Sequence, residues 1–186
     1  MSARRRWPVI SVVALAAAGL VLISPVLVAQ APKPDFSGVW ELDSGKSDDA
    51  EVAIRDALGL TGGRGERQAE RQALSSRLHY LARAAETMEI EQTDKDIKLF
   101  NSEDDVRIHY IDGQKHPRQN PSGEEMTTVT EWRESFLALT TEGPNIGKVT
   151  ETLGMEGLQL VHIVRIQNDA FEEDLVIRVY YDRADR

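Results

Sequence analysis

The chain has 186 residues, of which 41% are hydrophobic and 28% charged, values typical of a folded globular protein with one domain. Its formal net charge of −9, from 31 acidic and 22 basic residues, argues against nucleic-acid binding, because an acidic surface repels a phosphate backbone. The absence of cysteine excludes disulfides, thiolate catalysis and cysteine-containing zinc sites.

The first 31 residues predict an export signal. Three arginines at residues 4–6 precede an apolar stretch over 9–23, and the Ala-Gln-Ala of residues 29–31 is a small-residue cleavage site. Pro32 would follow the cut, where signal peptidases tolerate proline poorly, so an uncleaved membrane anchor is the alternative. In both cases the rest of the chain is expected outside the cytoplasm, periplasmic or secreted, and touches a membrane only through this segment.

A short stiff linker over residues 32–35 leads into a single domain, which is expected over residues 36–186. Residues 36–43 alternate in character, with Gly38 and Trp40 on the same side, and this alternation predicts a first β-strand. A large ring on a first strand is typical of the core residue that closes a small barrel.

The period then changes and predicts a two-helix insertion over about 47–86. Ser47 and Asp48 are candidate N-caps of the first helix, and Gly59 is a natural end for it. A second helix is expected over about 66–86. Its apolar stripe consists of Leu74, Leu78, Leu81 and Ala85.

From residue 87 on, the whole sequence is typical of β-structure. Short runs rich in valine, isoleucine, threonine and aromatic residues are separated by turn signals, apart from one longer polar loop at 112–125. The strands are expected over 87–93, 96–101, 105–111, 126–134, 136–142, 147–154, 158–167 and 174–182. This pattern predicts a mainly β protein, an antiparallel meander closed into a barrel or folded into a sandwich.

The last two predicted strands are apolar on both faces, which is unusual for a strand whose outer face meets water. We therefore expect a cover for that face, supplied either by the helical hairpin or by a second copy of the chain. The sequence does not decide whether the helices lie over the mouth of the barrel or along its wall.

The order of these elements resembles the calycin barrels, meaning lipocalins and especially fatty-acid-binding proteins. Those proteins open with a Gly-x-Trp strand, insert two helices and end on a strand carrying Arg-x-Tyr, matched here at residues 36–40 and 178–180. The chain is also similar to a group of exported bacterial proteins of undefined function. That group shares an Asp-Phe-Ser-Gly-x-Trp-x-Leu start and an Asp-Gly-x-Lys-His-Pro loop, matched at residues 35–42 and 112–117.

The resemblance implies a calycin-like barrel that binds a small apolar or amphipathic ligand without a cofactor. Arg178 and Tyr180 match the pair that holds a fatty-acid carboxylate, and an inward guanidinium beside a phenol can bind a carboxylate by charge-assisted hydrogen bonds. The alternatives for Arg178 are stacking over Trp40 or pairing with an acid to close the barrel, or facing water. Trp40, with Gly38 beside it, matches the tryptophan that plugs the closed end.

The chain departs from the family in three respects. Its helical segment is longer, and one strand fewer than the family's ten is evident. A second anion-binding arginine has no unique match, because Arg107, Arg133 and Arg165 all fall on predicted strands.

Recognisable catalytic and metal-binding motifs are absent from the sequence. The four histidines, at positions 79, 109, 116 and 162, have no metal-ligand spacing, and neither a Gly-x-Ser-x-Gly elbow nor a phosphate loop occurs. We therefore expect a protein that is not an enzyme and binds no metal. The alternative to a ligand-binding protein is a structural or interaction protein of the bacterial cell envelope with a filled barrel, and the volume of the cavity distinguishes the two.

Overall fold

The computed structural model describes residues 32–60, 66–102, 105–120 and 123–184, and its regular part consists of two helices and ten strands. The chain begins with β1 (Gly38–Leu42), followed by α1 (Ala50–Ala57) and α2 (Glu66–Ala82). The remaining strands are β2 (Thr87–Gln92), β3 (Asp96–Ser102), β4 (Asp105–Tyr110), β5 (Lys115–Gln119), β6 (Glu125–Arg133), β7 (Phe136–Gly143), β8 (Gly147–Glu156), β9 (Gln159–Gln167) and β10 (Leu175–Arg183).

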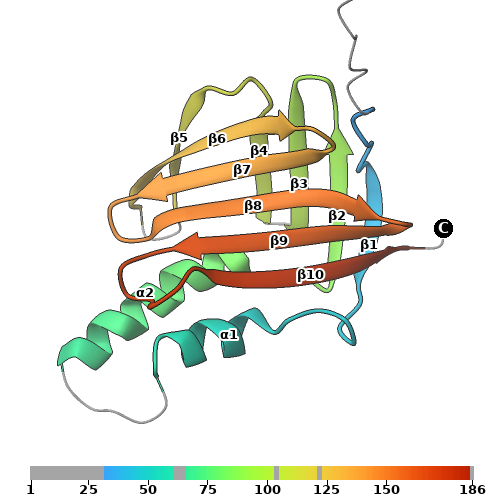
Figure 1. The fold of residues 1–186 in the computed structure, drawn as a ribbon. Coiled ribbons are helices and arrows are strands. Elements are labelled where there is room, and N and C mark those ends of the chain that lie inside the picture. The colour runs from blue at the N-terminus through green and yellow to red at the C-terminus, as the bar shows by residue number, and fades with distance from the viewer. Residues whose placement is uncertain (1–31, 61–65, 103–104, 121–122, 185–186) are drawn as a thin grey trace, which may run out of the picture.

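The ten strands form one antiparallel sheet in the order β4-β3-β2-β1-β10-β9-β8-β7-β6-β5, which curls into a nearly closed barrel. The pairing of β1 with β10, in which Leu42 lies opposite Tyr181, joins the two ends of the domain. In Figure 1, β6 to β10 cross in front of β2 to β4 at a steep angle. The two strands at the ends of the sheet, β4 and β5, are not hydrogen-bonded to each other, so the barrel wall is open between them.

The mainly β meander and the insertion of two helices after the first strand are confirmed. Alternation between buried and exposed side chains is clear along β2, where Met88 and Ile90 are buried and point inward while Glu89 is exposed. The prediction of nine strands was one short. The missing strand is β5, which falls in the expected loop at 112–125 and has the sequence Lys-His-Pro-Arg-Gln. It lacks apolar residues, and proline is tolerated there because β5 is an edge strand.

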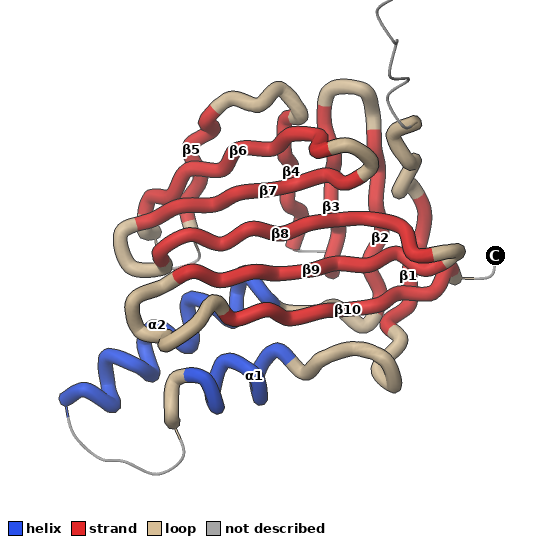
Figure 2. The backbone as a smooth tube through the Cα atoms, viewed as in Figure 1, coloured by secondary structure: helices blue, strands red, loops and turns tan. Residues whose placement is uncertain are grey.

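The helices cover the mouth of the barrel rather than its outer wall. Figure 2 shows both helices at one end of the molecule, beside β10. On α2, Arg77 pairs with Glu124 at 2.9 Å, which fixes the helix to the turn between β5 and β6. The cap of α1 is Asp49 rather than Ser47 or Asp48, since the Asp49 side chain accepts a hydrogen bond from the backbone N–H of Val52.

The centre of the barrel is filled with side chains. Leu139, Val164 and Ile177 point inward from β7, β9 and β10, and each has no surface that a water-sized sphere can touch. The helices extend this core, because Ile54 of α1 and Leu78 of α2 are also fully buried in it. The side chains at the middle of the barrel therefore leave no water-sized space beside these residues.

Within the described residues, no helix is both long and apolar enough to cross a bilayer. The predicted export leader, residues 1–31, lies outside the described residues.

Candidate functional site

Arg178 and Tyr180 lie on the outer face of β10, which corrects the interior placement expected from the sequence. The Arg178 side chain is exposed, and it is the backbone of this residue that is held at Asp48. Its N–H donates to Asp48 Oδ2 at 2.8 Å, and its carbonyl oxygen accepts from the Asp48 backbone N–H at 2.8 Å. The Tyr180 ring is half-buried beneath Lys46, whose Nζ lies 3.9 Å from the ring centroid. The residues that point inward from this strand are Ile177, Val179 and Tyr181.

The difference concerns which of the two alternating sets of side chains on β10 faces the core. Alternation with a period of two places Arg178 and Tyr180 on one face, as expected, but both faces of β10 are apolar, so the sequence did not show which face meets the core. Tyr181, the neighbour of opposite phase, is the core tyrosine, and burial raises the pKa of its phenol to about 12.

Trp40 is buried in the barrel, with 1% of its surface exposed. Its indole Nε1 donates to the backbone oxygen of Phe36 at 2.8 Å, and the guanidinium of Arg183 lies 4.9 Å from the centroid of its ring. Arg183 therefore has the stacking position that was one alternative for Arg178. Gly38 has a φ of 135°, and a Cβ there would lie 3.4 Å from the Arg183 guanidinium, so glycine suits both the backbone and the close approach.

A charged network crosses the interior from β4 to β8 and β9. Arg107 Nη1 donates to both oxygens of Glu151, at 3.0 and 2.9 Å, and His162 Nε2 lies 3.1 Å from Glu151 Oε2. Arg107 is 6% exposed and Glu151 is 1% exposed. Of the three arginines that the sequence left open, only Arg107 points inward, while Arg133 and Arg165 are exposed.

Arg107 and Glu151 are both ionised. Burial by itself would raise the pKa of the Glu151 carboxyl, but the Arg107 guanidinium and the His162 ring together hold that pKa well below its usual range. Burial disfavours the charged form of Arg107, yet Glu151 raises the pKa of that guanidinium above its usual value. Each charge therefore depends on the other for its solvation.

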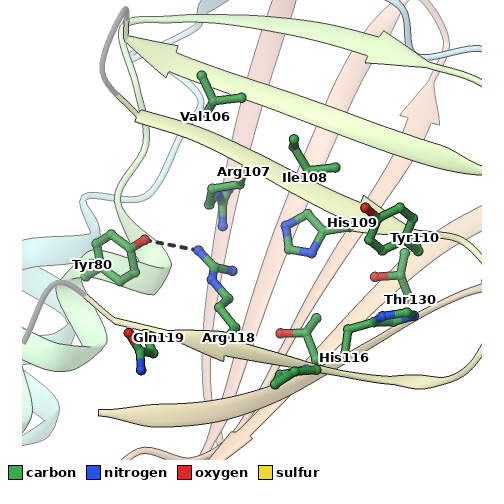
Figure 3. Close-up of a pocket in the computed structure, with 12 residues that line it drawn as sticks. Tyr80, Val106, Arg107, Ile108, His109, Tyr110, His116, Arg118, Gln119 and Thr130 are labelled. Carbon is green, nitrogen blue, oxygen red and sulfur yellow. Dashed lines mark hydrogen bonds between the residues drawn. The ribbon is translucent and has the colours of Figure 1, made fainter. Parts of the chain in front are cut away.

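The opening between β4 and β5 forms a cleft of about 560 Å³, to which β6 and α2 also contribute (Figure 3). At one end the rings of Tyr110 and His116 are in contact, with centroids 5.0 Å apart. At the other end Tyr80 of α2 accepts a hydrogen bond from Arg118 Nη2 at 3.1 Å. The cleft is thus bounded at both ends by side chains and lies beside the filled centre of the barrel.

The rim and the inner side of the cleft differ in chemistry. Because β4 is an edge strand, side chains from both of its faces line the cleft. The outward residues Val106, Ile108 and Tyr110 are 42%, 53% and 51% exposed and form an apolar rim. The inward residues of the same strand, Arg107 and His109, are buried and polar. A molecule in this cleft would meet nitrogen donors on its inner side and apolar side chains at its rim.

His109 is neutral at physiological pH. Burial, together with the charges of Arg107 and Arg118, lowers the pKa of its imidazole to about 3 against an opposing effect of Glu151. Its Nε2 has no hydrogen-bond partner in the part of the chain that the structure describes. A neutral imidazole carries one N–H, so it can still donate one hydrogen bond to a ligand from this atom.

The cleft is not evident from the sequence. One signal was present, because Arg107 and His109 are two apart on a predicted strand and must share a face. The opposite side of the cleft gives no such signal, because Arg118 lies on β5, whose sequence is typical of a polar loop. Among the described residues, no group of three histidine or acidic side chains is arranged to hold a metal ion.

Neither a protein-family model nor a curated protein sequence matches the chain. Similar solved structures include the REP1-NXSQ fatty acid transporter, with 18% identity, a TM-score of 0.52, and coverage of 81% of this chain and 96% of that one. Lipid binding protein 8 of Caenorhabditis elegans has 14% identity and a TM-score of 0.54 over 84% of this chain and all of its own. The fluorescent protein UnaG has 16% identity and a TM-score of 0.52 over 80% and 97%. These similarities confirm the predicted fold, a barrel like that of the fatty-acid-binding proteins.

Proposed function

We propose that this protein is a non-catalytic binding protein for a small amphipathic ligand, which it takes in the cleft between β4 and β5. The observation that supports this most is that an exposed apolar rim and buried nitrogen donors meet in one cleft. The cleft volume of about 560 Å³ lies within the roughly 300–1,000 Å³ that small-molecule sites occupy, although other surface hollows are as large. The titles of two neighbours in fold, which name a fatty acid transporter and a lipid binding protein, support the same class of ligand. The leader-like residues 1–31 support action outside the cytoplasm.

The apolar rim indicates how such a ligand would lie. The exposed side chains of Val106, Ile108 and Tyr110 follow one another along β4, so an alkyl chain could cover them while its polar end reaches the buried donors. Removing apolar surface of this kind from water contributes roughly 25 cal/mol per Å² to the free energy of binding.

A protein whose barrel serves only as a scaffold for a protein partner is the second candidate. The filled interior favours it, because the side chains at the centre leave no water-sized space of the kind a central ligand would need.

Calorimetric titration of the purified protein with dodecanoate separates the two candidates. We expect saturable binding, and we expect Ile108→Asp to weaken it by about tenfold or more, because a carboxylate at the apolar rim opposes both the chain and the headgroup. The matched control is Leu158→Asp, which adds the same charge at a residue that is 89% exposed and outside the cleft.

Two outcomes would contradict the proposal. Absence of dodecanoate binding, together with no lipid in an organic extract of the purified protein, would favour the interaction protein. An equal loss of binding in Ile108→Asp and Leu158→Asp would show that binding does not involve this cleft.

A further inference from the structure

Three buried nitrogen atoms on the inner side of the cleft lack hydrogen-bond partners among the described residues. They are Nε2 of His109, Nε of Arg107 and Nη1 of Arg118. They come from the two strands that face each other across the opening, β4 and β5. Buried donors are nearly always paired in folded proteins, so three orphans around one cleft indicate an acceptor that belongs there.

The charge on this side of the cleft is positive. Figure 3 shows the guanidinium of Arg118 pointing toward Arg107 and His109. No acidic residue is found among the described residues that line the cleft. Glu151 lies behind it, where it already accepts from Arg107 Nη1 and is close to His162. Glu151 is matched by Arg107, whereas Arg118 forms no ion pair among the described residues, so the local balance favours an anion over a cation.

We propose that the inner side of the cleft is a binding subsite for an oxyanion, a carboxylate or phosphate group at the end of an apolar chain. Arg118 and His109 donate to its oxygens from opposite strands, and Arg107 donates through Nε while its Nη1 stays on Glu151. The proposal rests on the proposed function and specifies the polar end of the ligand.

The geometry gives the anion two kinds of partner. Arg118 supplies a charge-assisted hydrogen bond, which is stronger than one between neutral groups. His109 supplies a neutral donor at a buried position, which fixes where the oxygen lies. Arg118 is only half-buried and is already held by the Tyr80 hydroxyl, so its guanidinium is positioned before the ligand arrives.

The test compares ligands that share a tail but differ at the polar end. Calorimetric titrations use dodecanoate, dodecyl phosphate, dodecanol and inorganic phosphate. We expect the two charged amphiphiles to bind about tenfold or more tightly than dodecanol. Arg118→Met should reduce this ratio to about threefold or less, since it removes the charge and keeps an unbranched side chain.

The matched control is Arg178→Met, which makes the same change at the exposed arginine that the sequence resemblance had nominated. It should leave the ratio unchanged. Should Arg118→Met fail to fold by circular dichroism, His109→Phe replaces it, and a loss of about threefold or more in dodecanoate affinity is expected there.

The outcomes separate this inference from the proposed function. Equal binding of dodecanoate and dodecanol would overturn the anion subsite and leave the binding function standing. Binding of inorganic phosphate that depends on Arg118, without binding of any dodecyl compound, would support an anion subsite and contradict the amphipathic ligand. Loss of the ratio in Arg178→Met but not in Arg118→Met would overturn the assignment to this cleft.

Discussion

Glu151→Leu is expected to lower the free energy of unfolding by about 3–5 kcal/mol, because it leaves the guanidinium of Arg107 buried without a counter-charge. Arg107→Leu should lower the free energy of unfolding by a similar amount, since it leaves the carboxylate of Glu151 buried without its guanidinium partner. The double variant should lose less than the sum of the two, because no unpaired charge remains. Urea unfolding of the four proteins measures this cycle.

The control for this prediction is the exposed pair formed by Glu131 and Arg133, whose atoms are 2.7 Å apart. Glu131→Leu should change the free energy of unfolding by less than about 1 kcal/mol, as is usual for ion pairs at the surface. If Glu151→Leu cost no more than Glu131→Leu, the buried network would not be the structural element that we describe.

The stability of the protein should fall on mild acidification because of His109. In the unfolded chain this imidazole has its ordinary pKa of 6.5, whereas in the folded protein the pKa is about 3. Between these values the unfolded state binds a proton that the folded state does not, so stability is complete above pH 6.5 and is lost as the pH falls toward 3. The loss amounts to about 2 kcal/mol between pH 7 and pH 5, and to about 4 kcal/mol by pH 3.

Urea unfolding at several pH values tests this prediction. His109→Phe removes the titrating group, so its stability should depend less on pH than that of the wild type by about 2 kcal/mol between pH 7 and pH 5. Ile108→Thr, on the outer face of the same strand, should retain the wild-type dependence. Identical pH profiles for the wild type and His109→Phe would mean that His109 is not buried in its neutral form.

The fold could be predicted because most strands contrast clearly between their two faces, and because the pattern changes period at the helices. The strand β5 could not be predicted, since Lys-His-Pro-Arg-Gln has no aliphatic or aromatic hydrocarbon side chain apart from its proline. Its pairing also depends on β6 alone. The phase of β10 could not be predicted either, because Val176 and Tyr180 on its outer face are as apolar as the residues inside.

These two gaps explain why the sequence placed Arg178 and Tyr180 inside the barrel and gave no indication of the cleft. Because β5 was not predicted, neither the direction of the Arg118 side chain nor its neighbouring strand could be predicted. Arg107 remained one of three equivalent arginines. With the phase of β10 undetermined, the Arg-x-Tyr resemblance placed Arg178 inside. The cleft depends on where the sheet fails to close, and that is a property of all ten strands together rather than of any one segment.

We propose that the ligand binds at the opening between β4 and β5, beside a barrel whose centre is filled. A crystal structure of the protein with dodecanoate decides whether this is so. We predict the carboxylate between Arg118 and His109, with the alkyl chain along Val106 and Ile108. A ligand found instead at the centre of the barrel, displacing side chains such as Val164, would contradict the claim.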